Sequence, residues 1–131
     1  MTMTGRCHCG GIEFKAEIDP KDVIVCHCTD CQTLSGSAYR TVAFTLPDGL
    51  TVTKGEPTVY IKVADSGNER MQSFCPTCGT PIYSGPVGDG PKVYGIRVGA
   101  LDNRRDLIPS KQCYTHSRLD WLPLMQAEDV S

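Results

Sequence analysis

Seven of the eight cysteines of this chain fall into three short clusters. Their sequences are Cys7-His8-Cys9, Cys26-His27-Cys28-Thr29-Asp30-Cys31 and Cys75-Pro76-Thr77-Cys78-Gly79. Cysteines one or two residues apart can place both sulfurs on one ion, and a tetrahedral zinc site takes four such ligands, drawn here from at least two clusters. Seven thiolates divide into four and three. This count predicts one closed site of four sulfurs and one site of three with an open position, and an open position is what separates catalytic from structural zinc.

The composition fits one domain spanning residues 1–131, with 40% hydrophobic residues for a modest core. The net charge is −2 and no run of Lys or Arg occurs, which argues against a nucleic-acid partner. The first six residues lack the apolar stretch of a signal peptide, and no apolar segment approaches membrane-spanning length. We therefore expect a cytoplasmic protein without a membrane partner. In that reducing compartment cysteines stay as thiols, which favours metal over a disulfide framework.

Short segments with strand composition or apolar alternation recur along the chain, at residues 11–18, 23–25, 39–45, 51–54, 58–63, 71–74, 81–84 and 92–98. Turn residues separate them at 19–22 and 46–49. At most one helical turn is expected after Cys31, capped by Thr29 or Asp30 and ended by Gly36. The 13 glycines and 9 prolines between short strands predict an antiparallel all-β fold, because parallel strands would need crossover helices.

The third cluster has the form of a zinc knuckle, in which Gly79 can take the positive φ that the tight turn favours. The first cluster can supply two more sulfurs, since Gly10 and Gly11 let the backbone curl around an ion. A zinc shared by these two clusters would tie the first strand to the middle of the fold. Metal binding at such a site can be worth roughly 10 to 16 kcal/mol at neutral pH. We therefore expect this site to be structural.

The three cysteines of the middle cluster lie close enough to bind one ion, and the fourth ligand decides what that ion does. If Cys113 or His116 fills the position, the chain holds two closed structural sites and is a binding module. If the position stays open to water or a thiol, zinc acts there as a Lewis acid. His8 and His27 lie between cysteines in extended chain, so alternation turns them away from the ions. His27 could instead line the mouth of the site and move protons.

The clusters and the residues around them resemble a known family in their order along the chain. The segments concerned are Cys7-His8-Cys9-Gly10-Gly11, Cys26-His27-Cys28-Thr29-Asp30-Cys31, Ser35-Gly36, Phe74-Cys75-Pro76-Thr77-Cys78-Gly79-Thr80 and Gly99-Ala100-Leu101-Asp102. Nearly the whole chain is similar to the glutathione-dependent formaldehyde-activating enzyme family, whose domain also occurs in a centromere protein. The resemblance implies an all-β Mss4-like fold stapled by zinc. It assigns a structural zinc to Cys7, Cys9, Cys75 and Cys78, and a catalytic zinc to Cys26, Cys28 and Cys31.

The resemblance also implies a carbon-sulfur lyase that adds glutathione, as co-substrate, to formaldehyde and gives S-hydroxymethylglutathione. Its partners would be a small thiol and a small aldehyde. We also expect that the chain could form a homodimer. Arg40, Arg97 and Lys111 are the basic residues considered for the two carboxylates of glutathione, and we expect each to be a solvated surface charge. Oxidation of the middle cluster would leave its zinc partly occupied. The alternatives are a zinc-stapled binding module without catalysis and an aldehyde-handling enzyme that does not use glutathione.

Overall fold

The computed structural model describes residues 1–122 and 128–131. Its strands, in chain order, are β1 (Thr2–Arg6), β2 (Glu13–Cys26), β3 (Arg40–Lys54), β4 (Thr58–Val63), β5 (Glu69–Phe74), β6 (Pro81–Pro86), β7 (Gly95–Arg97), β8 (Lys111–Cys113) and β9 (Glu128–Asp129). Helix α1 spans Thr29–Ser35, and three single turns of 3-10 helix follow at Val98–Ala100, Arg104–Asp106 and Thr115–Ser117. The predicted all-β class is confirmed. None of the described helices is long and apolar enough to cross a membrane.

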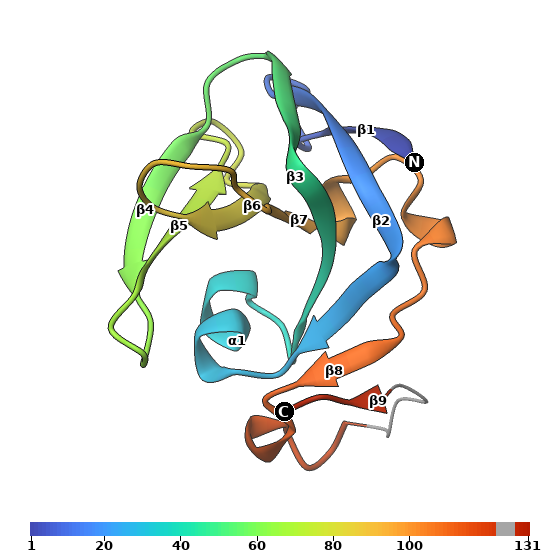
Figure 1. The fold of residues 1–131 in the computed structure, drawn as a ribbon, viewed down its shortest axis with the longest axis vertical. Helices are drawn as coiled ribbons and strands as arrows, with labels where there is room; N and C mark the ends of the chain where they lie inside the picture. Colours follow the sequence, from blue (N-terminus) through green and yellow to red (C-terminus); the bar gives the residue numbers. More distant parts are fainter. Residues whose placement is uncertain (123–127) are drawn as a thin grey trace.

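The strands form one sheet that curls around its own inner face (Figure 1). The hydrogen-bonded order is β4-β5-β6-β7-β3-β2-β8-β9, with β1 added to β2. Most neighbours are antiparallel, as the frequent turns predict, but β8 is parallel to β2 and β9 is parallel to β8. These two short strands at the carboxyl end were not predicted, because three-residue and two-residue segments show no periodicity. The pairing of β8 with β2 nevertheless brings the eighth cysteine, Cys113, beside Cys26.

The long strands β2 and β3 run through two of the predicted turns. The pairing between them shifts register between Ile18 and Val23, where the four residues 19–22 of β2 lie opposite the single residue Phe44 of β3. Residues 19–22 therefore form a bulge that bends the strand without ending it, and the Asp19 carboxylate accepts a hydrogen bond of 2.9 Å from the Lys21 amide. Residues 46–49 likewise lie inside β3. The prediction of separate strands was wrong here, because the turn-forming residues 19–22 and 46–49 lie within continuous strands.

The core lies against the inward face of β2 and its neighbours. Alternate residues of β2 point inward, and Phe14, Ala16 and Ile18 are each about 1% exposed. This period of two is what the sequence of residues 11–18 indicates. The buried cluster also includes Cys7 and Cys75. The first and third cysteine clusters are therefore packed on the edge of the hydrophobic core.

Helix α1 begins directly after β2 and lies between the long strands and the β4–β5 hairpin (Figure 1). Its N-cap is Cys28, whose sulfur accepts a hydrogen bond of 3.2 Å from the Cys31 amide, and neither Thr29 nor Asp30 has that role. The helix ends at Gly36, which has a left-handed φ of 66°, as predicted. The helix has seven residues rather than one turn. The capping hydrogen bond brings Cys28 and Cys31 together at the start of the helix.

Candidate metal centres

Cys7, Cys9, Cys75 and Cys78 form the four-thiol cluster, in which all four sulfurs lie within 4.8 Å of one another. The first pair follows β1 and the second follows β5, so residues 66 positions apart in the chain meet here. The Sγ atoms of Cys7 and Cys9 are 3.6 Å apart, and those of Cys9 and Cys75 are 3.8 Å apart. A tetrahedron with zinc–sulfur bonds of about 2.3 Å places its sulfurs about 3.8 Å apart. The donor set therefore fits a tetrahedral zinc ion.

Tight turns direct backbone amides at the sulfurs of the four-thiol cluster. The Ile12 amide donates to the Cys7 sulfur at 3.2 Å, and the amides of Thr77 and Cys78 donate to the Cys75 sulfur at 3.4 and 3.5 Å. Gly79 has a φ of 79°, as the knuckle predicts, and Gly10 has a φ of 78° in the matching turn. Amides that donate to a sulfur stabilise its anionic form. This arrangement prepares the turns for thiolate ligands.

The pKa values in the four-thiol cluster diverge. Hydrogen bonds from the Thr80 hydroxyl and amide lower the pKa of Cys78 to about 5. Burial raises the pKa of Cys7, but the Ile12 amide and the neighbouring thiols bring it below its ordinary value. The Gly11 amide lowers the pKa of Cys9, whereas contact with Cys7 and the other sulfurs raises it to about 11. Part of this cluster is thus disposed to be anionic before any metal binds.

Cys26, Cys28 and Cys31 form the three-thiol cluster, whose sulfurs also lie within 4.8 Å of one another. Cys26 ends β2, Cys28 caps α1 and Cys31 lies in its first turn. A strand that passes directly into a helix turns all three side chains toward one point. None of the eight cysteines forms a disulfide. The three thiols can therefore bind one metal ion and leave a coordination position for another ligand.

The thiols of this second cluster hold their protons more tightly than usual. Contact with Cys113 is the main cause that raises the pKa of Cys26 to about 12. Contact with Cys26, followed by burial, raises the pKa of Cys31, while the nearby Arg40 opposes that rise. Burial raises the pKa of Cys28. Crowded thiols of this kind become ligands when a cation replaces their protons, so the cluster fits zinc as a ligand set.

Cys113 lies beside the three-thiol cluster because β8 pairs with β2. Cys113 is the direct parallel neighbour of Cys26, and hydrogen bonding from Cys26 lowers the pKa of Cys113. It is half-buried and lines the same pocket, but its sulfur is outside the set of three mutually close ones. His116 also lines the pocket and is exposed. The structure brings both predicted fourth-ligand candidates, Cys113 and His116, near the three-thiol cluster. The thiol of Cys113 contacts that of Cys26.

Neither His8 nor His27 joins a metal cluster among the described residues. His8 is exposed, and His27 is fully buried with its Nε2 atom 3.0 Å from the Gln112 side-chain oxygen. Since His27 follows Cys26 in extended chain, its ring lies on the opposite face, near Tyr39. His27 is not among the residues that line the pocket, so its proposed proton transfer has no support from its position.

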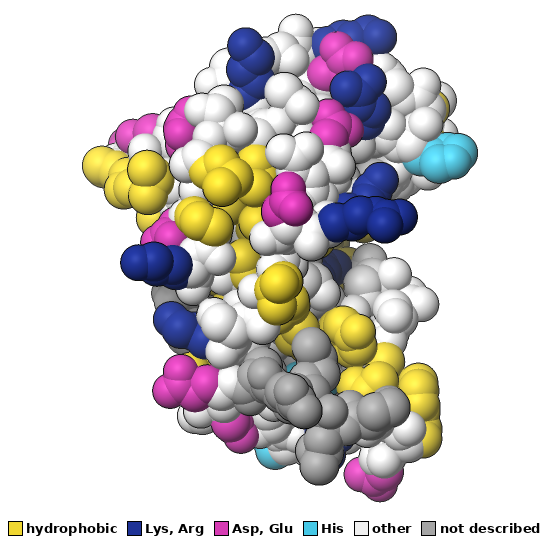
Figure 2. Space-filling view, turned by 90° about the vertical axis from the view of Figure 1, so that its right-hand side faces the viewer, with side chains coloured by type: hydrophobic (Ala, Val, Ile, Leu, Met, Phe, Trp, Pro, Cys, Tyr) yellow, Lys and Arg dark blue, Asp and Glu magenta, His cyan; other side chains and the backbone are white. Residues whose placement is uncertain are grey.

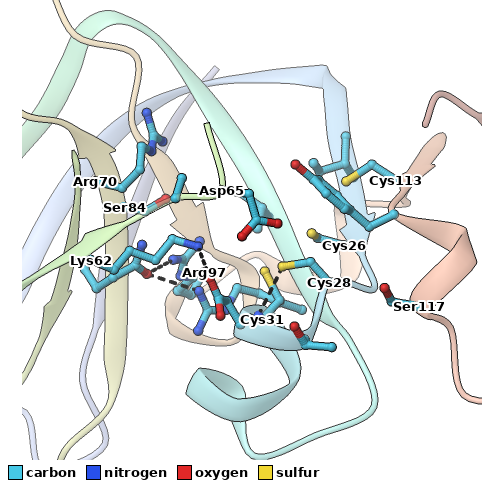
Figure 3. Close-up of a pocket in the computed structure, with 18 of the residues that line it drawn as sticks. Cys26, Cys28, Cys31, Lys62, Asp65, Arg70, Ser84, Arg97, Cys113 and Ser117 are labelled. Atoms are coloured by element: carbon cyan, nitrogen blue, oxygen red, sulfur yellow. Dashed lines mark hydrogen bonds and ion pairs between the residues drawn. The ribbon is translucent and has the colours of Figure 1, made fainter. Parts of the chain in front are cut away.

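The three-thiol cluster opens into a pocket of about 400 Å³ (Figure 3). Figure 3 shows Cys26 and Cys28 on one side and Lys62, Arg70 and Arg97 across from them. Arg40 and Arg97 also line this pocket, and their exposed fractions are only 6% and 8%. The prediction that these two arginines are solvated surface charges was therefore wrong. Strand pairing buries them, because Arg40 lies directly opposite Cys26 in β3 and Arg97 pairs with Val42, two residues further along β3.

Gln72 holds the two buried guanidinium groups together. Its side-chain oxygen accepts a hydrogen bond of 3.2 Å from Arg40 and one of 2.8 Å from Arg97. Burial, and then the charge of Arg40, lowers the pKa of Arg97 to about 9. Sequence reasoning missed Gln72, Arg70 and Lys62, since nothing in their local sequence marks them. Lys111, the third basic candidate, lies in β8 and is not among the pocket residues.

Outside the pocket the charges are mixed. The face shown in Figure 2 carries basic, acidic and apolar side chains interspersed. The four ion pairs among the described residues are partly exposed, as in Arg6 with Asp102 at 3.2 Å and Lys62 with Asp30 at 2.9 Å. The buried positive charge at the pocket is therefore distinct from this mixed surface.

Comparison with known proteins supports one family. The family model described as "Glutathione-dependent formaldehyde-activating enzyme" matches residues 2–117. A protein of Schizosaccharomyces pombe named as an uncharacterized lyase is 33% identical over 79 residues, which cover 60% of this chain and 54% of that protein. The chain thus spans about half the length of this curated relative. A crystal structure of a Rhodobacter sphaeroides protein superposes with a TM-score of 0.60 at 25% identity, covering 77% of this chain and 89% of that one.

Proposed function

This chain belongs to the glutathione-dependent formaldehyde-activating enzyme family, and from that premise we propose that it is a zinc-dependent carbon-sulfur lyase. In the direction of synthesis it would add a small thiol to a small aldehyde and give an S-hydroxymethyl adduct. Glutathione and formaldehyde are the pair that the family name suggests. The name of the Schizosaccharomyces pombe relative is consistent with a lyase.

One observation carries this proposal: the three-thiol cluster lines a pocket of about 400 Å³, large enough for a small-molecule substrate. The four-thiol cluster has a full set of four sulfurs for a tetrahedral ion. The three-thiol cluster supplies one fewer, so a ligand from the pocket can complete it. Catalytic zinc sites are built in this way, with three protein ligands and an exchangeable fourth position.

Zinc bound by Cys26, Cys28 and Cys31 would supply a soft Lewis-acid position that favours a thiol as its thiolate over water. The protein then has to hold the thiolate and orient the aldehyde beside it. Arg40 and Arg97 face the cluster with positive charge, which stabilises anions in a partly desolvated pocket. Exposed lining residues such as Thr29 and Asp65 leave the pocket accessible to water.

The reaction balances without a further reactant. The thiol loses its proton, its sulfur forms a bond to the carbonyl carbon, and the electron pair of the C=O bond moves to oxygen. That oxygen takes up one proton, so the product contains all atoms of the two substrates. Water in the pocket can deliver the proton, and no buried acid is required. Arg40 and Arg97 line the same pocket and would stabilise the negative charge that develops on that oxygen.

The activity is tested by exchange NMR on mixtures of formaldehyde and glutathione, with and without the zinc-loaded protein. We expect the protein to accelerate hemithioacetal exchange and the Cys28→Ser variant to lose that acceleration. Repeating the measurement with cysteine and 2-mercaptoethanol separates a glutathione-specific enzyme from one that uses other thiols. No acceleration with any of the three thiols would reject the proposed activity.

The position of Cys113 favours a second candidate, a zinc-stapled binding module. Because its thiol contacts Cys26, it could complete the second site and close it. Metal analysis of a Cys113→Ser, His116→Ala double variant distinguishes the two. An open site keeps two zinc ions per chain, whereas a site closed by either residue loses one. Substitution with cobalt reports the same difference, since sulfur-to-cobalt charge-transfer absorption falls when a thiolate is removed.

A further inference from the structure

Strand β4 (Thr58–Val63) forms an open edge of the sheet. It pairs with β5 on one side, and no other strand of the described residues pairs with it. Figure 1 shows β4 at one end of the sheet, away from β8 and β9. Backbone N–H and C=O groups on the outer side of an edge strand can pair with a strand from another chain. This edge is therefore a place where a second chain can be added.

The side chains of β4 give this edge little protection against association. Edge strands usually avoid pairing through charged side chains, proline or a bulge. The one charged residue of β4, Lys62, is held by Asp30 at 2.9 Å, and its side chain is only 19% exposed. The strand contains no proline, and its pairing with β5 has no register shift. Its large exposed side chains are Val59 and Ile61 at 41%, Tyr60 at 54% and Val63 at 67%.

The two faces of β4 differ in character. Lys62 marks the inner face, because it lines the pocket beside the three-thiol cluster. Alternation along a strand places Tyr60 on the same face. The outer face then carries only aliphatic side chains, which are those of Val59, Ile61 and Val63. A strand that pairs with β4 has to match both faces.

We propose that β4 is a dimer interface, at which β4 of a second copy of this chain pairs antiparallel with it about a two-fold axis at Ile61. The partner is a second copy because β4 is complementary to itself. Directly opposite side chains of an antiparallel pair lie on the same face, so a two-fold pairing sets one residue opposite its own copy. With Ile61 in that place, Val59 lies opposite Val63. The outer face then forms three aliphatic pairs.

The same register is complementary on the inner face. Tyr60 of each copy lies opposite Lys62 of the other, which keeps the two lysines apart and sets an ammonium group beside an aromatic ring. From residue 56 to residue 66, this register places no two like charges directly opposite each other. A two-fold axis at Tyr60 would form only two aliphatic pairs within the strand. An axis at Lys62 would set the two lysines opposite each other. The sequence of β4 therefore favours the axis at Ile61.

The interface is small, because each copy contributes one strand of six residues. Small interfaces form transient complexes. We therefore expect a dissociation constant of about 1–100 μM, so that the dimer forms as the protein is concentrated. The inference goes beyond the proposed function and does not depend on it, since the outer edge of β4 takes no part in the reaction.

The first experiment is sedimentation equilibrium of the zinc-loaded protein between about 1 μM and about 1 mM, a range that brackets the expected dissociation constant. We expect the mass to rise from one chain to two. Ile61→Lys sets two positive charges opposite each other and should raise the dissociation constant at least about tenfold. Ile108→Lys is the matched control, since Ile108 is 77% exposed and lies outside the strands, and it should dimerise like the wild type.

The register is tested by mixing two variants. Ile61→Glu should also dissociate the dimer, because two carboxylates then face each other. An equimolar mixture of Ile61→Lys and Ile61→Glu should restore the two-chain species, since opposite charges meet at the axis. Urea denaturation checks that both variants are folded. A mixture that stays monomeric overturns the proposed register, because only a residue that faces its own copy gives this rescue.

Hydrogen exchange of the wild type provides a measurement that needs no variant. Amides of β4 should exchange more slowly at the highest protein concentration than at the lowest, whereas amides of β1, which also pairs with one strand only, should not change. Equal exchange of β4 at both concentrations, or dimerisation of Ile61→Lys like that of the wild type, overturns the proposal. A wild type that stays a single chain throughout also overturns it and makes an extended segment of another protein the occupant to test.

Discussion

The four-thiol and three-thiol clusters share their ligand chemistry but differ in origin and surroundings. The first joins turns after β1 and β5, on the edge of the core, with backbone amides aimed at its sulfurs. The second comes from one stretch where β2 passes into α1, and it faces a pocket with two buried arginines. A site that connects distant segments gains stability from its metal. A site assembled locally and facing a pocket has room for a ligand from that pocket.

The largest expected effect comes from breaking the four-thiol cluster. Cys75→Ser removes one buried thiol of the cluster. A zinc ion bound there would tie β1 to β5, so we expect the variant to lose that ion and much of the roughly 10 to 16 kcal/mol that such a site can contribute. We expect one zinc fewer per chain and a largely unfolded protein by circular dichroism at 37 °C. Cys28→Ser is the control, which should also lose one zinc yet stay folded. Similar melting temperatures for the two variants would contradict the division of roles.

The two clusters should release their metal at different pH values. A thiol binds zinc as thiolate, so each proton displaced lowers the apparent affinity about tenfold per unit fall in pH. The pKa of Cys26 is raised to about 12 and those of Cys28 and Cys31 are also raised, so three protons compete there. In the four-thiol cluster the pKa of Cys78 is lowered to about 5 and that of Cys7 is also lowered, which outweighs the rise of the pKa of Cys9 to about 11. As the pH falls, the three-thiol cluster should therefore lose its zinc first.

A chromogenic zinc indicator read during acid titration gives the two release steps. The Cys28→Ser variant assigns them, because only the step of the four-thiol cluster should remain in it. Release from the four-thiol cluster at the higher pH would reverse the comparison and contradict the role of the Cys78 environment.

Removal of one ligand from the three-thiol cluster should affect activity far more than stability. We expect Cys31→Ser to lower kcat/KM for hemithioacetal formation by at least about 100-fold, because the metal position that activates the thiol is lost. The urea midpoint of Cys31→Ser should stay close to that of the wild type, whereas that of Cys75→Ser should fall far below it. Exchange NMR and urea denaturation of the same preparations test both parts. Full activity in Cys31→Ser would exclude this cluster from catalysis.

The arginine pair offers a stability test of the same contrast. Arg97→Met removes a buried charge that repels Arg40, so it should leave the unfolding free energy unchanged or raise it by about 1 kcal/mol. Urea denaturation without added anions measures the change. A loss of several kcal/mol would show that Arg97 serves the fold rather than the pocket.

The smallest expected effect concerns the knuckle turn. Gly79 has a φ of 79° and open space where a Cβ would lie, so Gly79→Ala should cost about 1 kcal/mol from backbone strain alone. Gly99→Ala is the matched control, because it meets equally open space without a positive φ. Urea denaturation of the zinc-loaded proteins should show a lower midpoint for Gly79→Ala only. Equal midpoints would mean that the turn tolerates the strain.

The cysteine clusters could be predicted from sequence because ligand spacing is a local property. Two sulfurs separated by one or two residues meet in any tight turn, and Gly79 marks that turn. The alternation of residues 11–18 likewise indicates one face of β2 from neighbouring residues alone. Residues 19–22 show the limit of this reasoning, since their turn chemistry was absorbed as a bulge in a strand whose pairing with β3 continues on both sides.

The sequence by itself determined the all-β class, the two groups of cysteines that could hold metal ions, and the glycine turn at Gly79. Only the tertiary structure decided what lies around the second group. Arg40 and Cys113 both neighbour Cys26, but they reach it through antiparallel and parallel strand pairing across the sheet. Burial of a charged side chain depends on such long-range pairing, and no local pattern encodes it. The spacing of Cys26, Cys28 and Cys31 predicted their cluster, whereas the positively charged pocket that they face forms only when the sheet folds.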